Sequence, residues 1–153
     1  MNHYSPADFP FSGSIGHYLG SAALLKDRLL DSHLASLEIS AAQFKVLIYI
    51  YLEKANTPAD LCRLLSVDSG SMTRMLDRLE KKGLLHRKPC PTDRRCVRLT
   101  LSAAGQAVCQ QTPEVVARAM NELARGLSHD ELQSLLGLLE KMLQPHTTAA
   151  AER

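Results

Sequence analysis

Apolar residues recur three or four positions apart along most of the chain, and this spacing places side chains on one face of a helix. The first such segment runs from Ile15 to about Leu37. Residues 1–12 contain prolines and phenylalanines without any period, so we expect a flexible N-terminal arm. The polar, alanine-rich residues 146–153 are expected to form a loose tail.

Capping residues indicate where the next helices begin. Ser40 and Gln43 form a capping-box pattern, and the helix that follows is expected to bury Phe44, Leu47, Ile48 and Tyr51. Thr57 is suited to cap a short third helix, because Pro58 has no N–H to lose at its first position. The inward side chains of this third helix are expected to be Leu61, Leu64 and Leu65.

A fourth helix is predicted from about Ser69 to Lys82, ending at Gly83. At 100° per residue its apolar flank contains Met72, Met75, Leu76 and Leu79. Its other flank is polar and contains Gly70, Arg74, Asp77 and Lys81, with Thr73 beside them. We expect the apolar flank to pack in the core and the polar flank to remain available to a partner.

A β-hairpin and two more helices complete the prediction. Residues 84–88 and 96–100 have extended character, and the segment between them has a basic tip stiffened by prolines. Ser102 is expected to cap a fifth helix, which Pro113 should kink or split in two. Ser128 and Glu131 form a second capping box at the start of the last helix.

This order of elements predicts a mainly α fold with a small β-hairpin wing, that is, a winged helix-turn-helix in residues 41–100. The remaining helical parts, residues 13–40 and 101–145, are rich in leucine. Because those helices need a surface to bury against, a second copy of the chain is the simplest solution. We therefore expect these two segments to form a helical dimerisation region.

Composition excludes several classes of protein. The chain has 153 residues, of which 45% are hydrophobic and 22% charged, as in an ordinary single globular domain. Its longest apolar run is Val46–Leu52, far short of the ~20 residues of a membrane span. The four cysteines form no CxxC pair and no signal-peptide pattern is present, so reduced thiols in the cytoplasm are expected. No nucleotide-binding, hydrolase or metalloprotease motif is found, and neither enzymatic activity nor a cofactor is expected.

Charge is concentrated in one segment. Between Arg74 and Arg98 there are nine basic and three acidic residues, whereas the rest of the chain is net acidic. A positive stripe on an acidic body is typical of a surface that binds a polyanion. The alternative is a merely solvated charged helix. Because the stripe coincides with the predicted helix-turn-helix and hairpin, we favour binding of double-stranded DNA.

The same residues resemble the MarR family of bacterial transcription regulators. The resemblance covers about Ile15 to Leu143 and is strongest in the windows AAQFKVL, TPADL, LSVDSGSMTRMLDRLEKKGLL and PTDRR. It implies a homodimer that represses by occupying near-palindromic operators. It also implies DNA contacts from the fourth helix and from the wing, made by Ser69, Ser71, Thr73, Arg74, Asp93, Arg94 and Arg95.

Individual roles follow from chemistry and from the resemblance. The Arg74 guanidinium can form two hydrogen bonds to guanine. The alternative for this side chain is an exposed salt bridge on the helix, with Asp77 or with a neighbour of Arg78. By resemblance, Arg95 is expected to enter the minor groove and to be oriented by Asp93, whereas Arg94 is expected to contact phosphate.

Members of the family commonly respond to small aromatic acids and other lipophilic anions. The resemblance places effector contacts at Pro58, Thr73, Met75, Arg78 and Arg87. An alternative effector pocket lies between the first helix, at His17 and Tyr18, and the DNA-binding unit.

The cysteines suggest a further alternative, a thiol-responsive regulator. Lys81 replaces the oxidant-responsive cysteine of the family's founding member, which removes the direct basis for thiol sensing. Cys90 and Cys96 flank the wing tip and are able to pair as a disulfide, although reduced thiols are the simpler interpretation. Zinc binding by these residues with His86 lacks the usual ligand spacing. A winged-helix adaptor that binds protein or RNA is the remaining alternative, although no aromatic cluster on the basic stripe supports stacking on single strands.

Overall fold

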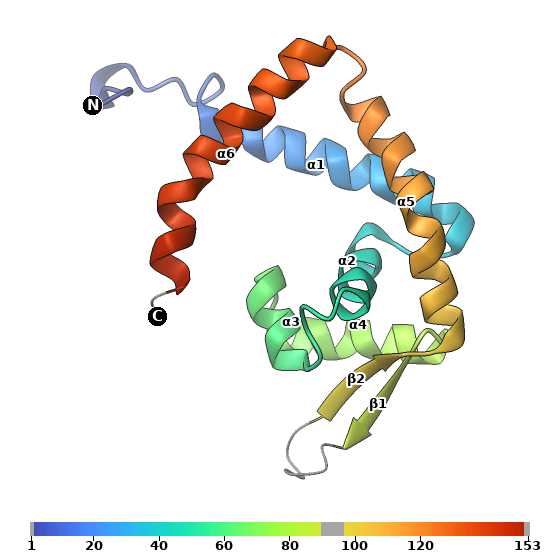
Figure 1. The fold of residues 1–153 in the computed structure, drawn as a ribbon. Coiled ribbons are helices and arrows are strands. Elements are labelled where there is room, and N and C mark those ends of the chain that lie inside the picture. Colours follow the sequence, from blue (N-terminus) through green and yellow to red (C-terminus); the bar gives the residue numbers. More distant parts are fainter. Residues whose placement is uncertain (1, 90–96, 152–153) are drawn as a thin grey trace.

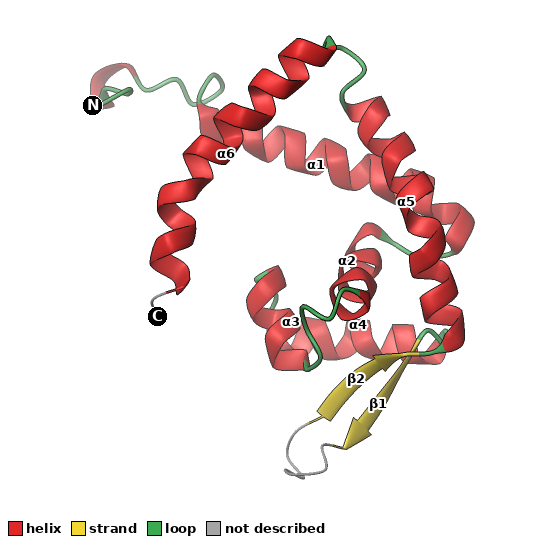
Figure 2. Ribbon diagram, viewed as in Figure 1, coloured by secondary structure: helices red, strands yellow, loops and turns green. Residues whose placement is uncertain are grey.

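The computed structural model describes residues 2–89 and 97–151, with side chains up to Gln144. In chain order the elements are η1 (Pro6–Asp8), α1 (Ile15–Leu34), η2 (Ala35–Leu37), α2 (Ala41–Tyr51), α3 (Pro58–Leu65), α4 (Ser69–Lys81), β1 (Leu85–Pro89), β2 (Val97–Leu101), α5 (Ala103–Leu123) and α6 (His129–Ala151). The helices and the two-stranded antiparallel sheet (Figure 2) confirm the predicted fold class.

The elements form two parts. Helices α2, α3 and α4 pack together with the β1–β2 hairpin, which projects from them at the bottom of Figure 1. Helices α1 and α5 pack on each other above this unit, and both contact α2. Helix α6 crosses over the top of the molecule and packs extensively on no other described element.

The predicted capping boxes are confirmed. At the start of α2, Ser40 Oγ accepts a hydrogen bond from the Gln43 N–H, and Gln43 Oε1 accepts one from the Ser40 N–H, both at 3.2 Å. Ser128 and Glu131 make the same reciprocal pair before α6, at 3.3 and 2.8 Å. These bonds satisfy N–H groups that have no partner within the helix.

Capping residues also begin the two helices of the helix-turn-helix, α3 and α4. Thr57 Oγ1 accepts from the Asp60 N–H at 3.2 Å, and Pro58 is the first residue of α3. Asp68 caps α4 through its carboxylate, and Gly83 follows α4 with a φ of 69°, a conformation that favours glycine.

The core confirms the apolar flank of α4 and corrects two other expectations. Tyr51 is 40% exposed and Leu64 is 42% exposed, although both were expected to face inward. Helix α2 is apolar around most of its circumference, so periodicity alone does not identify its buried face. The largest fully buried side chains come from α1, α2, α3, α4, β1 and α5 and are Leu34, Val46, Leu47, Leu61, Met72, Leu76, Leu79, Leu85, Cys109 and Thr112.

Helix α5 is continuous, and Pro113 does not split it. The Thr112 hydroxyl donates a hydrogen bond of 2.6 Å to the Cys109 carbonyl oxygen, which the missing N–H of Pro113 would otherwise leave without its helical donor. The backbone of α6 is helical to Ala151, which corrects the expected loose tail for residues 146–151. Alanines, which terminate this segment, have the highest helix propensity.

The segment before α1 is partly organised. It contains the 3-10 turn η1, and the Tyr4 hydroxyl accepts a hydrogen bond of 2.9 Å from the Ile15 N–H. The rings of Tyr4, Phe9 and Phe11 form consecutive edge-on contacts at 5.3 and 5.2 Å.

Within the described part of the chain, no single helix is long and apolar enough to cross a membrane. The bent pair formed by residues Ile15–Leu37 and Ala41–Tyr51, at 75° to each other, meets that criterion by length and composition only.

Candidate nucleic-acid interface

The exposed flank of α4 presents short polar side chains and one arginine. Ser69, Thr73 and Arg74 are exposed and Ser71 is half-buried, whereas Met72 on the opposite flank is fully buried. Arg74 Nη2 donates to Ser71 Oγ at 3.0 Å, and Thr73 Oγ1 donates to the Ser69 carbonyl at 2.8 Å. Three of the four predicted residues of this helix are therefore exposed, and the contacts join Thr73 to Ser69 and Arg74 to Ser71.

The N-terminus of α4 is capped by the carboxylate of Asp68. Hydrogen bonds from the Ser71 side chain and N–H lower the pKa of the Asp68 carboxyl. The Asp68 carboxylate accepts a hydrogen bond of 2.8 Å from the Ser71 N–H, which belongs to the first turn of the helix. Asp68 thereby stabilises the N-terminal end of α4, the helix that exposes Arg74.

Asp77 pairs with the wing rather than with Arg74. Arg87, on β1, donates from Nη2 to Asp77 Oδ1 at 2.7 Å, and its Nε lies 3.7 Å from Glu80 Oε2. The Arg87 backbone N–H also donates to Glu80 Oε1 at 3.3 Å. This group of contacts, which we call the Arg87 clasp, joins β1 to α4, and the alternative ion pair between Arg74 and Asp77 is wrong.

The wing strands are positive at the end that leads to the wing tip. Lys88 and Arg98 are directly opposite each other in the β1–β2 register, and both are exposed. Like charges at opposite positions destabilise a two-stranded sheet. A polyanion bound beside the strands would relieve this repulsion. The tip residues Asp93, Arg94 and Arg95, together with Cys90 and Cys96, lie outside the described residues.

The effector residues expected from the resemblance are only partly brought together. Arg87 Nη2 lies 3.4 Å from the Thr73 carbonyl oxygen, so these two positions are neighbours. Pro58 and Met75 are half-buried and Arg78 is exposed, and no hydrogen bond within the described chain joins Arg78 to Thr73 or Arg87. The Arg87 guanidinium is already engaged by the chain's own carboxylates.

His17 and Tyr18, the positions of the alternative effector pocket, lie near the N-terminal end of α1. Their rings stack edge-on, with centroids 5.5 Å apart. Helix α1 contacts α2 through its C-terminal half, where Asp27 pairs with Lys45 at 3.0 Å and Asp31 accepts a hydrogen bond from the Ala41 N–H at 2.6 Å.

Sequence reasoning missed Glu80 and Lys82. Lys82 Nζ donates to Gln43 Oε1 at 3.1 Å and to the Glu38 carbonyl, which ties the end of α4 to the loop before α2. The three-residue spacing of Asp77 and Glu80 indicates that both carboxylates lie on one face of α4, but it does not identify the residue that they bind.

Comparison with known proteins agrees with this geometry. Residues 39–97 match the model of the MarR family. The chain is 46% identical over 119 residues to the multiple antibiotic resistance protein MarR of Escherichia coli, covering 77% of this chain and 83% of that protein. A crystal structure of mutant E. coli MarR complexed with operator DNA superposes with a TM-score of 0.77 at 42% identity, covering 89% of this chain and 99% of that one.

A more distant structure concerns the regulation of DNA binding of Bordetella bronchiseptica BpsR by 6-hydroxynicotinic acid. It superposes with a TM-score of 0.75 at 26% identity and covers 88% of this chain and 96% of that chain. The similarity therefore extends over both the helix-turn-helix and the helices around it.

Proposed function

This chain belongs to the MarR family, and we propose that it is a homodimeric, sequence-specific regulator that represses transcription by occupying a near-palindromic operator. Members of this family are DNA-binding transcription regulators rather than enzymes. The observation that carries the proposal is the amphipathic α4, which buries Met72 and Leu76 and exposes Arg74, together with the exposed basic side chains of the wing strands. Such a regulator acts in the cytoplasm, where bacterial operators are found.

The proposed DNA contacts come from α4 and the wing. Helix α4 enters the major groove, where Arg74 binds a guanine and Ser69, Ser71 and Thr73 contact neighbouring bases or phosphates. Arg95 enters the adjacent minor groove, oriented by Asp93, and Arg94 contacts phosphate. Lys88 and Arg98, which are exposed on the same hairpin near its tip, support this mode.

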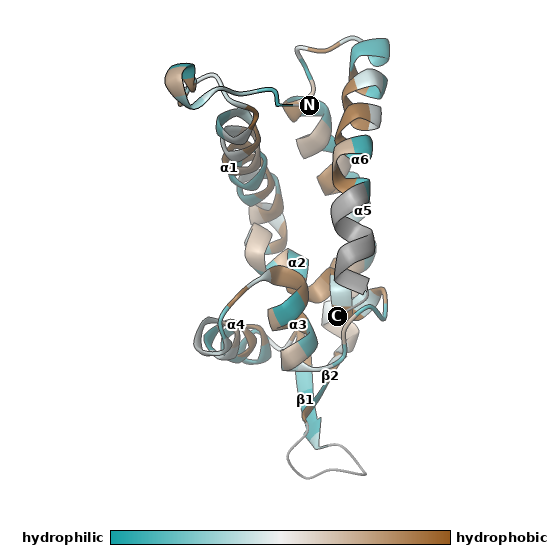
Figure 3. Cartoon of the chain, turned by 90° about the vertical axis from the view of Figure 1, so that its left-hand side faces the viewer, coloured by the Kyte–Doolittle hydropathy of each residue, from teal (hydrophilic) through white to brown (hydrophobic). Residues whose placement is uncertain are grey.

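The proposed dimer uses residues 13–40 and 101–145. The apolar side chains that α6 leaves in contact with solvent include Leu136, Leu138 and Leu143, which are 50%, 66% and 56% exposed. Helix α1 exposes Tyr18 and Leu24, each by 64%. Figure 3 shows apolar stretches along both helices. A surface this apolar is stabilised by association, and a twofold partner covers the same face on both copies.

The proposed effector is a small aromatic or phenolic acid. The ligand named for BpsR, 6-hydroxynicotinic acid, belongs to this class. Pro58, Thr73, Met75, Arg78 and Arg87 are the proposed contacts. The Nε of Arg87 is buried without a hydrogen-bond acceptor among the described residues, and Glu80 is only loosely placed against it. A carboxylate that displaces Glu80 would satisfy Nε and loosen the Arg87 clasp.

Melting curves with salicylate test the effector site. We expect salicylate to raise the melting temperature of the parent chain and not of Arg87→Ala. Asp77→Asn, which frees the guanidinium, should bind salicylate more tightly than the parent. Equal shifts in all three proteins would contradict the site.

Selection of bound fragments from a pool of genomic DNA, followed by footprinting, tests the main proposal. We expect enriched fragments to contain two inverted half-sites separated by about one helical turn, ~10 base pairs. Enrichment of fragments without a shared motif, or a protein that sediments as a monomer while bound, would contradict it.

A further inference from the structure

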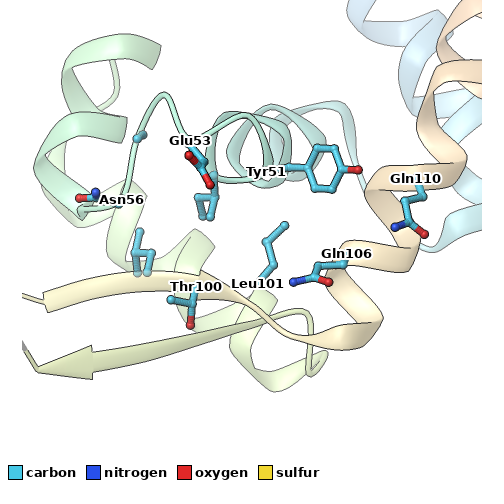
Figure 4. Close-up of a pocket in the computed structure, with 10 residues that line it drawn as sticks. Tyr51, Glu53, Asn56, Thr100, Leu101, Gln106 and Gln110 are labelled. Atoms are coloured by element: carbon cyan, nitrogen blue, oxygen red, sulfur yellow. The ribbon is translucent and has the colours of Figure 1, made fainter.

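A cavity of about 630 Å³ lies between the end of α2, strand β2 and the start of α5 (Figure 4). Its apolar lining includes Ile50, Ala55 and Leu99, which are buried and come from three different segments. Cavities of ~300–1,000 Å³ are of the size that holds small organic molecules. This cavity involves none of the effector positions proposed above.

Glu53 is the one charged residue among the described residues that line this cavity. Its carboxylate makes no ion pair or side-chain hydrogen bond with the rest of the described chain. Its backbone has a φ of 55°, in the left-handed region where glycine is favoured after a helix. Holding a glutamate in that conformation costs conformational free energy. Figure 4 shows the Glu53 side chain among the residues that line the cavity.

The remaining polar lining is neutral and offers both hydrogen-bond donors and acceptors. Gln106 and Gln110 on α5 contribute amide groups, whereas the Thr100 hydroxyl lies on the other side of β2 and the Asn56 side chain points away from the other lining side chains (Figure 4). The Tyr51 side chain extends toward α5 beside the two glutamines (Figure 4). An aromatic face attracts a cation, and amide oxygens accept hydrogen bonds from an ammonium group.

We propose that this cavity binds a small organic ammonium compound, a primary amine carried on an aromatic or aliphatic body. The amine pairs with Glu53, and the body packs on Ile50 and Leu99. An organic acid is disfavoured because its carboxylate would face Glu53 without a compensating cation. This cavity thus favours a cationic ligand, whereas the effector site at Arg87 favours an anionic one. The proposal does not require that the protein binds DNA.

The cavity spans a contact between the wing and the loop before α3. The Leu99 N–H donates a hydrogen bond of 2.8 Å to the Asn56 carbonyl oxygen, and both residues line the cavity. A ligand that contacts both sides of this bond holds β2 against the loop. Binding should therefore slow hydrogen exchange of the Leu99 amide.

Calorimetry on the full chain without DNA tests the site with three probes of one skeleton: 3-phenylpropylamine, 3-phenylpropan-1-ol and 3-phenylpropionate. We expect the amine to bind about fivefold more tightly than the alcohol, the effect of one solvent-accessible ion pair. The acid should bind more weakly than the alcohol. Exchange of the Leu99 amide, followed by NMR, should slow with the amine.

Two matched variants complete the experiment. Glu53→Gln removes the charge and should make the amine and the alcohol bind equally. Glu38→Gln makes the same change in a residue with a φ of 54° that does not line the cavity, and it should bind the amine like the parent. The proposal is overturned if the amine has no advantage over the alcohol, if both variants lose it equally, or if exchange at Leu99 is unchanged.

Discussion

Arg87 on β1 donates a hydrogen bond of 2.7 Å to the Asp77 carboxylate on α4, and this bond joins the wing to the proposed recognition helix. The two elements contact DNA in different grooves in the proposed complex, so their relative angle determines whether both fit at once. Arg87 is 28% exposed and Asp77 is 46% exposed. A pair this accessible to solvent contributes little to folding, and its main consequence is the position of the wing.

Asp77→Asn should weaken operator binding severalfold, although it removes a negative charge from a DNA-binding surface. The expected loss of folding free energy is below ~1 kcal/mol, because the pair is solvent-accessible. Fluorescence anisotropy with labelled operator measures the affinity. Glu114→Gln, which breaks the exposed pair with Arg118 on α5, is the matched control and should bind like the parent. Tighter binding by Asp77→Asn than by this control would show that charge outweighs wing position.

Arg74→Ala should reduce operator affinity by ~1–3 kcal/mol, the contribution of one arginine that binds a guanine. Its melting temperature should not change, because Arg74 is exposed and hydrogen-bonds only to Ser71 on the same helix among described residues. Arg118→Ala removes the same charge on α5 and serves as the control. Affinity should also fall steeply with salt, since bound counterions are released from the phosphates. An unchanged gel shift for Arg74→Ala would contradict its assignment.

The Cys109 thiol should be unreactive in the folded protein. Burial raises its pKa to about 11, so little thiolate forms at pH 8. In a chain with Cys90→Ser and Cys96→Ser, a thiol reagent at pH 8 should modify Cys62 quickly and Cys109 only on unfolding. Because the unfolded thiol ionises at lower pH than the folded one, Cys109 should also reduce stability as the pH rises from about 9 toward about 11. Two equally fast thiols would contradict its burial.

Gly105→Ala should destabilise the fold strongly. A Cβ at this position would lie 2.0 Å from the Leu84 carbonyl oxygen, which also accepts a hydrogen bond from the Ser102 N–H. The first turn of α5 must therefore move away from the end of the α4–β1 turn. Gly137→Ala is the control, because nothing lies within 4 Å of its Cβ and the helix should gain up to ~1 kcal/mol. Equal unfolding midpoints in urea would contradict the close approach.

Local signals predicted the helix starts and the α4 flanks, because caps and amphipathic spacing act within a few residues. The buried face of α2 was not predictable, since Val46–Leu52 is apolar throughout and only the packed neighbours select a face. The partner of Arg87 was also missed. Asp77 is ten residues away across a turn, and the three-dimensional position of β1 decides which carboxylate it reaches.

We expect the Thr112 hydroxyl to support the continuity of α5 at Pro113, and a double-mutant cycle measures this contribution. Thr112→Val keeps the shape of the side chain but leaves the buried Cys109 carbonyl without its donor, which should cost ~1–3 kcal/mol.

In the Pro113→Ala background, the backbone N–H that the substitution restores supplies the normal helical hydrogen bond to the same carbonyl. Thr112→Val should then cost at least ~1 kcal/mol less than in the parent, and this difference is the coupling energy. Urea unfolding of all four proteins at one fixed protein concentration is required, because the proposed dimer makes stability depend on concentration. Equal costs in both backgrounds would mean that the hydroxyl does not replace the N–H that proline lacks.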